Sequence, residues 1–471
     1  MRRVLLSLIV ALSCSILLPP GLAGLAGQTP WLDSYRPIAA RLLAESQSSD
    51  FAWRRLAELT DTFGNRLSGS DTLEKAIDWA VTEMKRDGLE NVHKEPVMVP
   101  KWVRGHESLE LLAPVHQPLV LLGLGNSIAT PPAGIEGDVV VVKSYDDLTA
   151  HAKDVNGRIV LLNVPFTTYG ETRPFRTDGA SRAAKLGATA FLLRSVGPPG
   201  LRTAHTGAMT YANDAPKIPA AAIPTEDADR LQRLADRGVR PRVRLMMDAH
   251  FEPDAPSANV VGELVGRELP RDVLVLGGHI DSWDVGAGAT DDGGGCIVTW
   301  EALRLMKKLN LRPRRTVRVV LFTNEENGTR GGNGYRDAHK AELGNHVLLL
   351  ESDGGVFEPA GFGFTFDPAK SGSPAAAERA RQTVASVASL LGAIGADHVT
   401  DGGEGTDIEP ASTAGNVPMM SHLDTGDYFL IHHTPADTIA RITPAQVSKN
   451  AAAIAVMIYT LADLPFRLGR E

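Results

Sequence analysis

The sequence predicts an α/β fold in which a mixed, largely parallel sheet is flanked by helices and interrupted by a smaller β-rich domain. From Ser257 onward, strand-like runs rich in Val and Leu alternate with helical patterns, which is typical of a sheet buried on both faces. Between residues 106 and 252 the pattern changes to short strands and turns. The chain has 471 residues, of which 43% are hydrophobic, and this allows more than one core. We therefore expect a main domain in two parts, 28–105 and 253–471, separated by an inserted domain over 106–252.

The first part of the main domain carries two helical patterns and one strand-like run. Apolar residues at helical spacing predict helices over Phe51–Leu59 and Leu73–Met84, and Ser70 is a plausible cap of the second. The run Val97–Val103 predicts a strand.

The inserted domain is expected to consist of short strands with two helices. The predicted strands are Leu109–Leu112, Leu119–Leu122, Asp138–Val142, Arg158–Leu162, Ala190–Leu193 and Ala220–Ile223. Helical patterns cover Gly179–Leu186 and Thr225–Arg237, whereas Tyr169–Arg176 and Gly197–Pro216 read as polar loops rich in Gly and Pro. None of these predicted strands ends in a cluster of metal-binding side chains, so we expect this domain to be non-catalytic.

The second part of the main domain alternates between strands and helices. Its predicted strands are Asn259–Val265, Asp272–Ile280, Thr316–Thr323 and His346–Leu350. Its predicted helices are Gly294–Lys308, Ala375–Leu391 and Pro444–Leu461.

The N-terminus has the pattern of a secretory signal. Two arginines precede an apolar stretch from Val4 to Leu18, and small residues follow between Ala23 and Gly27. The stretch is shorter than the roughly 20 residues that span a bilayer, so we expect a signal peptide over 1–27 and no integral membrane span after its removal. Lipidation at Cys14 is the weaker alternative, because the small residues before it fit a lipoprotein signal poorly. The protein is therefore expected to be secreted or periplasmic.

Net charge and cysteine content restrict the partners and the disulfide bonds that the protein is expected to have. A net charge of -8 with a pI near 5.9 argues against nucleic acid as a partner. After removal of the signal peptide, Cys296 is the one cysteine left, so no internal disulfide is expected. It lies in an apolar helical pattern, which predicts a buried structural thiol.

Candidate metal ligands gather where predicted strands end and in the loops nearby. They are His279, Asp281, Asp291, Asp292, Glu325, Glu326, Asp353, His432 and His433. In open α/β sheets, ligands bind beyond the carboxyl ends of the strands. Imidazoles and carboxylates in this number suit two divalent metal ions that share an activated water, with one carboxylate bridging the pair. Zn2+ fits this mixture of ligands, and Mn2+ or Co2+ are alternatives.

The residue types restrict the roles without assigning all of them. One of Asp291 and Asp292 is expected to bridge the metals, because the surrounding glycines allow a close approach of the backbone. Asp281 follows the predicted ligand His279 by two residues. It is expected to hold the imidazole of His279 in place without binding the metal itself.

Two neighbouring pairs share the remaining roles. Of Glu325 and Glu326, one is expected to bind metal and the other to act as the general base, because two carboxylates in one cleft raise the pKa of one of them. Of His432 and His433, one is expected to face the metal. Motifs of other hydrolases and of phosphate-binding loops, such as His-Glu-x-x-His, Gly-x-Ser-x-Gly and Gly-x-x-x-x-Gly-Lys, are missing from the sequence.

The ordered set His-x-Asp, Asp-Asp-Gly, Glu-Glu, Ser-Asp and His-Thr-x-x-Asp-Thr resembles that of the di-zinc aminopeptidase and glutamate carboxypeptidase family. The phrases Thr-Asn-Glu-Glu-Asn-Gly, Glu-Ser-Asp-Gly-Gly and Tyr-Phe-Leu-Ile-His-His-Thr are similar to its plasma glutamate carboxypeptidase branch, also called carboxypeptidase Q. The resemblance covers nearly all of the mature chain. It implies the zinc-exopeptidase fold, a protease-associated insert that caps the cleft, and a homodimer.

The resemblance also implies a role for each matched residue. His279 and Asp353 would hold one zinc ion, Glu326 and His433 the other, and Asp291 would bridge them. Glu325 would be the general base, and Asp281 would orient His279. Further residues are assigned to the substrate: Tyr428 or His432 would steady the oxyanion or simply pack, Glu404 and Asp407 would line the substrate pocket, and Asp424 would contact a substrate amine.

The leading hypothesis is a di-zinc exopeptidase that hydrolyses dipeptides or short peptides with a metal-activated water. Within the same fold, a broader aminopeptidase or a carboxypeptidase selective for an acidic end stays open, with Arg330, Arg173 and Arg176 as candidates for binding an acidic group. A non-catalytic binding protein on this scaffold and a single-zinc acyltransferase are the alternatives from other classes.

Overall fold

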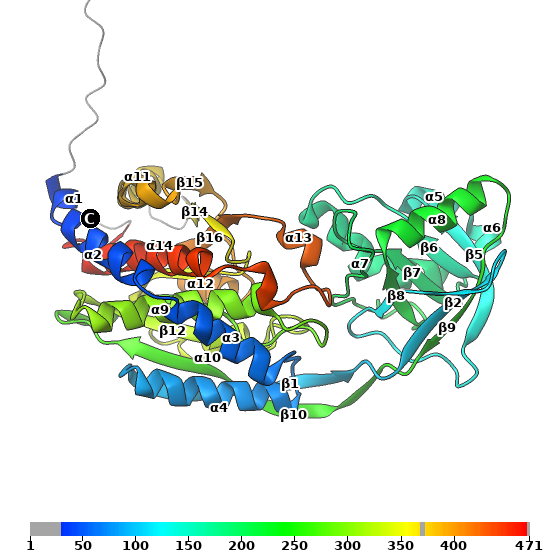
Figure 1. The fold of residues 1–471 in the computed structure, drawn as a ribbon, viewed down its shortest axis with the longest axis horizontal. Helices are drawn as coiled ribbons and strands as arrows, with labels where there is room; N and C mark the ends of the chain where they lie inside the picture. The colour runs from blue at the N-terminus through cyan, green and yellow to red at the C-terminus, as the bar shows by residue number, and fades with distance from the viewer. Residues whose placement is uncertain (1–29, 368–372, 469–471) are drawn as a thin grey trace, which may run out of the picture.

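The structure, a computed structural model, describes residues 30–367 and 373–468, and the expected signal peptide over 1–27 lies outside these ranges. The molecule is elongated, and its two domains lie end to end (Figure 1). Each domain is built on an eight-stranded sheet. The α/β fold with an inserted domain is therefore confirmed.

The sheet of the main domain has the strand order β1-β10-β12-β11-β13-β16-β14-β15. The strands are β1 (Glu90–Val103), β10 (His250–Leu264), β11 (Leu269–His279), β12 (Arg315–Phe322), β13 (His346–Glu351), β14 (Glu358–Thr365), β15 (His398–Asp401) and β16 (Met419–Thr425). Strands β12, β11, β13 and β16 are parallel neighbours in the centre, whereas β1 and β10 at one edge are antiparallel. The carboxyl ends of the central strands therefore meet at the same edge of the sheet.

Helices cover both faces of this sheet. They are α1 (Pro30–Asp33), α2 (Arg36–Gln47), α3 (Phe51–Phe63), α4 (Asp71–Arg86), α9 (Gly294–Lys308), α10 (Arg330–Ala338), α11 (Pro374–Ala388), α12 (Glu409–Gly415), α13 (Tyr428–Ile431) and α14 (Pro444–Asp463). The bounds of α9 are those that the sequence predicts. Alternate residues of β11 enter separate cores: Leu274 and Leu276 pack with α9 and α14, and Val273 and Val275 pack with residues of α10 and α12.

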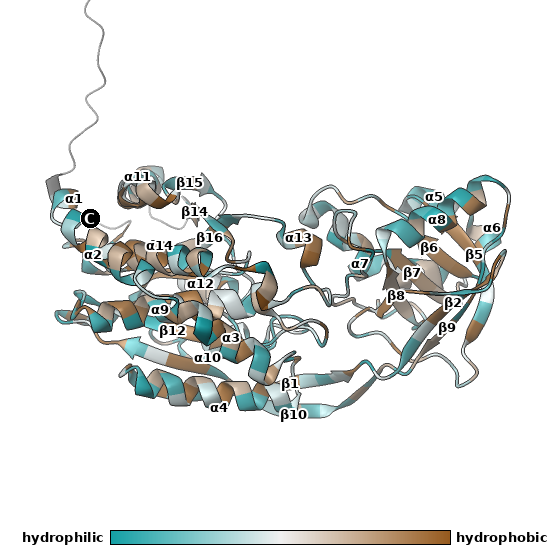
Figure 2. Ribbon diagram, viewed as in Figure 1, coloured by the Kyte–Doolittle hydropathy of each residue, from teal (hydrophilic) through white to brown (hydrophobic). Residues whose placement is uncertain are grey.

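The sheet of the inserted domain has the strand order β3-β2-β9-β5-β6-β7-β8-β4. Its elements are β2 (Glu107–Ala113), β3 (Gln117–Leu119), β4 (Leu122–Gly123), β5 (Ile135–Val142), α5 (Tyr145–Ala150), α6 (Ala152–Val155), β6 (Ile159–Leu162), α7 (Tyr169–Lys185), β7 (Ala190–Arg194), β8 (Ala220–Ile223), α8 (Thr225–Asp236) and β9 (Arg242–Met247). Figure 2 shows apolar strands β6 and β7 inside this domain and hydrophilic stretches on the surrounding α5 and α8.

Two expectations for the inserted domain are wrong. The strand expected over Leu119–Leu122 is divided into β3 and β4. The loop expected over Tyr169–Arg176 is instead the first half of α7. The side chain of Thr168 caps this helix by accepting a hydrogen bond from the N–H of Glu171. This cap and the burial of the helix against its domain outweigh the proline inside it.

A two-stranded antiparallel ribbon joins the domains. β1 and β10 pair from Glu90 opposite Glu263 to Val103 opposite His250, and they extend beyond the main sheet toward the inserted domain (Figure 1). The chain therefore enters and leaves the inserted domain at neighbouring points.

The domains are also joined by side chains. Trp283 follows β11 of the main domain but is buried in the core of the inserted domain, together with Trp102 of the ribbon. A Cβ added to Gly125 would lie 1.9 Å from the ring of Trp283, so the fit requires glycine there. Within residues 30–367 and 373–468, no helix has both the length and the apolar character needed to cross a membrane.

Candidate metal centre

The candidate ligands lie at the carboxyl edge of the main sheet. His279 is the last residue of β11, Glu325 and Glu326 follow β12, and Asp353 follows β13. These three strands are parallel neighbours, so their ends place the side chains in one place although the residues are far apart in sequence. Asp291 lies in the turn before α9.

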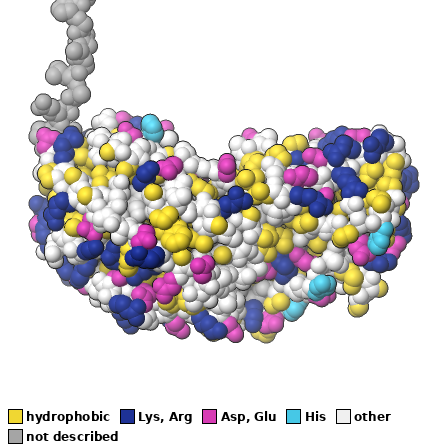
Figure 3. Space-filling model, viewed as in Figure 1, with side chains coloured by type: hydrophobic (Ala, Val, Ile, Leu, Met, Phe, Trp, Pro, Cys, Tyr) yellow, Lys and Arg dark blue, Asp and Glu magenta, His cyan; other side chains and the backbone are white. Residues whose placement is uncertain are grey.

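His433 comes from the other side of the site. It follows α13, which lies between the two domains (Figure 1). Figure 3 shows a notch in the outline of the molecule where the domains meet. His433 has a φ of 60°, a left-handed conformation that is strained for a residue other than glycine.

The first half of the site is formed around His279. Its Nε2 atom is 3.2 Å from Oδ1 of Asp291 and 3.4 Å from Oδ1 of Asp353. Its Nδ1 atom is 2.9 Å from the carbonyl oxygen of Asp281, so a proton on Nδ1 can be donated there. This leaves Nε2 free to bind a metal ion.

The second half is formed around His433. Its Nε2 atom is 3.1 Å from Oε2 of Glu326 and 3.2 Å from Oδ2 of Asp291. Asp291 thus turns one carboxylate oxygen toward each half. This is the geometry expected of a carboxylate that bridges two ions.

The donor atoms fit metal ions. Among the described residues, Nε2 of His279, Oδ2 of Asp291 and Oδ1 of Asp353 are buried without a hydrogen-bond partner. Three groups of donors also lie within 4.8 Å of one another: His279 with Asp291 and Glu326, His279 with Asp292 and Asp353, and Asp291 with His432 and His433. Because unpartnered buried polar atoms are unfavourable, cations bound among these donors would satisfy the three unpartnered atoms.

The ionisable side chains of the site lie close enough to shift the pKa values of one another. Burial lowers the pKa of His279, but the charge of Asp353 and hydrogen bonding to Asp291 and Asp353 raise it well above its usual value overall. Burial and the charge of Asp291 raise the pKa of Glu326 to about 8, and burial raises that of Asp353 to about 6. Buried carboxylates gathered this closely are stabilised when a cation binds among them.

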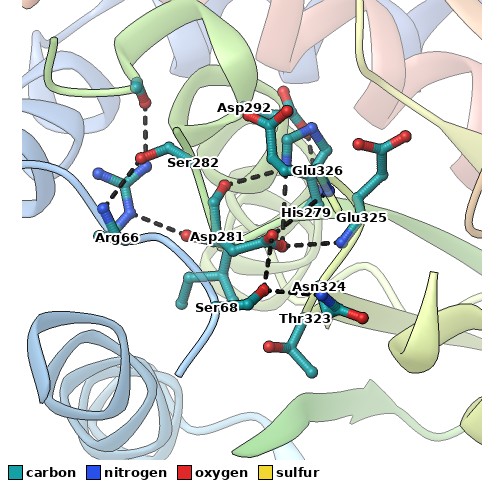
Figure 4. A network of polar contacts seen from close by, with 12 residues as sticks. Arg66, Ser68, His279, Asp281, Ser282, Asp292, Thr323, Asn324, Glu325 and Glu326 are labelled. Carbon is teal, nitrogen blue, oxygen red and sulfur yellow. Dashed lines mark hydrogen bonds and ion pairs between the residues drawn. The ribbon is translucent and has the colours of Figure 1, made fainter. Parts of the chain in front are cut away.

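Asp281 is placed differently from the expected contact with the His279 ring. Its Oδ1 atom is 3.8 Å from Nδ1 of His279, beyond hydrogen-bond distance, and the ring bonds instead to its backbone carbonyl. The carboxylate accepts hydrogen bonds from the N–H groups of Glu325 and Glu326, at 3.1 and 3.4 Å, and from the hydroxyl of Ser68 (Figure 4). Asp281 therefore fixes the loop that carries the two glutamates.

Glu325 and Glu326 have different surroundings. Glu326 is buried, and its Oε1 atom accepts the N–H of Trp283 at 3.1 Å while Oε2 faces His433. Glu325 is only half-buried, and its side chain extends away from the network around Asp281 (Figure 4). One glutamate is thus available to a metal ion and the other to a water molecule.

Asp292 is turned toward the backbone. Its Oδ2 atom accepts the N–H of His279 at 3.0 Å, and its Oδ1 atom accepts the N–H of Gly295 at 2.9 Å. The peptide bond between Asp291 and Asp292 is cis. Asp292 has an oxygen near His279 and Asp353, but both of its oxygens are engaged, which favours Asp291 as the bridging residue.

Two supporting residues were not singled out from the sequence. Arg66, with a fully buried side chain, donates hydrogen bonds to the carbonyl oxygens of Gly64, Ile280, Ala287 and Gly288 (2.7–3.0 Å) and so holds the loop after β11. Asp437 accepts bonds from the backbone of Thr290 and Asp291. Asp437 is the aspartate of the His-Thr-x-x-Asp-Thr motif, which could have marked it, whereas no sequence signal marks Arg66.

The residues expected to contact substrate are spread over different environments. Tyr428 and His432 are buried beside the site, and Nε2 of His432 is 3.6 Å from Oδ2 of Asp291. Asp407 is fully buried, and its N–H donates to Glu351. Glu404 is exposed.

Asp424 is half-buried and accepts the N–H of Phe357 at 2.6 Å, and burial raises its pKa to about 7. Of the three arginines considered for an acidic substrate, Arg173 and Arg330 are exposed. Arg176 is buried, with Nη1 3.4 Å from Nδ1 of His433.

Comparisons with known proteins agree with this arrangement. The sequence matches Peptidase family M28 over residues 259–458 and the PA domain over residues 117–231. It is 44% identical to carboxypeptidase Q of Homo sapiens over 431 residues, which cover 91% of this chain and 89% of the human protein. Carboxypeptidase Q of Bos taurus is 45% identical, with the same coverage of 91% and 89%. The resemblance predicted from the motifs is thereby confirmed.

Solved structures of peptidases are similar to this chain as well. A peptidase M28 precursor from Shewanella amazonensis is similar with a TM-score of 0.87 and 33% identity, covering 93% of this chain and 98% of that one. A zinc aminopeptidase from Bacillus subtilis has a TM-score of 0.64 at 21% identity, covering 87% of this chain and 94% of its own, and this likeness concerns the fold alone.

Proposed function

Since this chain belongs to peptidase family M28 and is a zinc metallopeptidase related to carboxypeptidase Q, we propose that it is a secreted di-zinc exopeptidase that hydrolyses dipeptides or short peptides. The observation that carries the proposal is the position of Asp291 between two sets of donors. One set contains His279 and Asp353, and the other contains Glu326 and His433.

In this proposal, His279 and Asp353 hold one zinc ion, Glu326 and His433 hold the second, and Asp291 contacts both. When bound, the ions supply a Lewis acid for the scissile carbonyl group and lower the pKa of water in the site. The burial of these side chains favours the assignment, because electrostatic interactions are stronger where water is excluded.

Glu325 is proposed as the general base. Its N–H is held by Asp281, while its half-buried side chain keeps access to water. A carboxylate in this position can take a proton from the attacking water and deliver it to the nitrogen of the leaving amine. Its neighbour Glu326 cannot serve both roles, since its two oxygens face Trp283 and His433.

Export and assembly belong to the same proposal. The arrangement of charged, apolar and small residues over 1–27 supports a signal peptide and a secreted or periplasmic location. The resemblance to the carboxypeptidase Q branch supports a homodimer. Fractionation of the expressed full chain and analytical ultracentrifugation of the mature protein test these two points.

Activity and metal content test the function directly. The purified protein is assayed on unblocked dipeptides and on the same dipeptides blocked at either end, before and after zinc removal with a chelator and after zinc is restored. We expect hydrolysis to disappear with zinc, to return with it, and to require about two ions per chain. Unchanged rates in chelator-treated, zinc-free protein would refute the proposal, and one ion per chain would favour the single-zinc alternative. The blocked substrates identify the end of the peptide that is recognised.

A further inference from the structure

Residues of the inserted domain contact the candidate ligand His433 directly. Thr206 lies in the segment between β7 and β8 of that domain. Its N–H donates to the carbonyl oxygen of His433 at 3.0 Å, and its own carbonyl oxygen is 3.3 Å from Nδ1 of the His433 ring. One residue of the inserted domain therefore holds both the backbone and the side chain of His433.

Thr206 is in turn fixed within its own domain. Its hydroxyl donates to the carbonyl oxygen of Gly123 at 2.7 Å and accepts from Nη2 of Arg104 at 3.2 Å. Arg104 also pairs with Asp284 in the loop that follows β11 of the main domain. The position of Thr206 is thus determined by contacts to both domains.

Arg176 of α7 donates hydrogen bonds to the same segment, which contains Thr206. Its guanidinium donates to the carbonyl oxygens of Ala208 at 3.2 Å and Thr206 at 3.4 Å, and to the hydroxyl of Tyr169 at 2.8 Å. A Cβ added to Gly207 would lie 2.3 Å from Nη1 of Arg176, so the side chain packs closely on this backbone. Arg176 is 5% exposed, and its planar group spans three acceptors that a lysine could not reach together.

The contacts at Nδ1 hold one orientation of the His433 ring, because the carbonyl oxygen of Thr206 lies 3.3 Å and Nη1 of Arg176 lies 3.4 Å from this atom. A proton on Nδ1 can be donated to the carbonyl oxygen of Thr206, which leaves the lone pair on Nε2, the atom that faces Asp291 and Glu326. Without this acceptor, the ring could rotate or carry its proton on Nε2. The left-handed φ of His433 also needs a partner to hold it, and the N–H of Thr206 supplies one.

We propose that Arg176 and Thr206 of the inserted domain are positioning residues for His433, and that the inserted domain thereby sets the zinc affinity of the Glu326–His433 half of the site. The inference rests on the proposed role of His433 as a zinc ligand. It gives the inserted domain a part in building the metal centre, in addition to any part in covering it. Partners of metal-binding histidines commonly change metal affinity by about 10- to 100-fold when they are removed.

The experiment measures zinc affinity by competition with a chelator whose own affinity is known, on the full mature chain. The test variants are Arg176→Met, which removes the guanidinium, and Thr206→Val, which removes the hydroxyl and keeps the branched shape. Matched controls are Arg173→Met on the exposed side of α7 and Thr210→Val at an exposed position. His433→Ala serves as the reference for loss of the ligand. Thermal unfolding of each zinc-free variant shows whether the fold itself has changed.

We expect one of the two zinc ions, the one in the Glu326–His433 half, to lose about 10- to 100-fold in affinity in Arg176→Met and a smaller amount in Thr206→Val, with both controls unchanged. A purely structural role would lower the unfolding temperature of the zinc-free protein and leave the affinity of the folded form unaltered. If Arg176→Met does not fold, Arg176→Lys decides, because a lysine keeps the charge and cannot reach the three acceptors together.

Native affinity in the folded Arg176 variants, together with a loss in His433→Ala, overturns this inference alone. Native affinity for two ions in His433→Ala overturns the ligand assignment on which both proposals depend.

Discussion

The carboxylate of Asp437 holds the backbone of Asp291. Its Oδ2 atom accepts the N–H of Asp291 at 3.1 Å, and its Oδ1 atom accepts both the N–H and the hydroxyl of Thr290 at 2.8 Å. Asp437 lies four residues after His433, so one short segment carries a candidate ligand and also supports the candidate bridging residue. The position of Asp291 between the two halves of the site therefore depends on the chain that follows α13.

Asp437→Asn is expected to weaken zinc binding by about 10- to 100-fold, because an amide NH2 group would meet at least one backbone N–H that now donates to the carboxylate. Chelator competition measures the change. Asp397→Asn, at an exposed position, is the matched control and should bind zinc like the parent protein. Equal affinity in the two variants would contradict the supporting role of Asp437.

Glu325→Gln is expected to lower kcat by about 10²- to 10⁴-fold, which is the usual contribution of a general base. Zinc content should stay that of the parent protein, because the groups of close metal donors contain Glu326 and not Glu325. Elemental analysis and dipeptide hydrolysis measure the two quantities on one sample. Glu378→Gln on the exposed side of α11 controls for the charge change. A variant that loses zinc along with activity would assign Glu325 to the metal instead.

Arg66→Met is expected to lower the free energy of unfolding by about 3 kcal/mol or more, because the hydrogen bonds of its buried guanidinium to four carbonyl oxygens are lost together. Urea unfolding of the zinc-free protein measures the change without a contribution from metal binding. Arg36→Met is the control, since Arg36 is exposed and pairs only with the exposed Asp33 among the contacts described for it. Similar stability of both variants would show that the loop after β11 does not need Arg66.

Asp424 predicts a pH dependence of stability. Burial raises its pKa in the folded protein to about 7, above its usual value near 3.8. A raised pKa means that the folded state binds the proton more tightly, so this contribution to stability is complete below about pH 4 and is lost as the pH rises through 7. Asp424→Asn removes the titration, and its amide oxygen can still accept the N–H of Phe357.

The stability of Asp424→Asn relative to the parent should therefore increase from pH 5 to about pH 7, by on the order of 1 kcal/mol per pH unit, and level off above pH 7. Urea unfolding of the zinc-free proteins across this range checks it. A difference that does not vary with pH would show that Asp424 titrates near its usual value.

Sequence patterns predicted the centre of the main domain better than its edges. The apolar strands β11, β12 and β13 and the helix α9 were predicted because they are buried and strongly patterned. Strands β14 and β16 were not predicted, because glycines interrupt the apolar pattern of β14 and polar residues interrupt that of β16, and because the two form through pairing with each other. Helix α7 was missed in its first half because Gly170 and Pro174 suggest a loop, whereas its cap and its burial are properties of the folded domain.

The candidate site could also be predicted from the sequence only in part. Parallel strand ends explain why His279, Glu326 and Asp353 could be proposed from the sequence, because each follows an apolar run. The partners of these side chains are often backbone atoms, such as the carbonyl oxygen of Thr206 beside His433. Because all residue types have the same backbone carbonyl group, contacts of this kind cannot be predicted from the residue type and are visible only in the structure.

The ribbon of β1 and β10 has a consequence for the order in which the protein folds during synthesis. β1 pairs with β10, and all of the inserted domain, from β2 to β9, is translated between the two. All strands of the inserted domain are therefore synthesised before β10, the strand that pairs with β1. Domains generally fold as units while the chain emerges from the ribosome. The sheet nested in the middle of the chain is thus the first to be complete, whereas the core beneath it closes only after Trp283 of the surrounding domain has been synthesised.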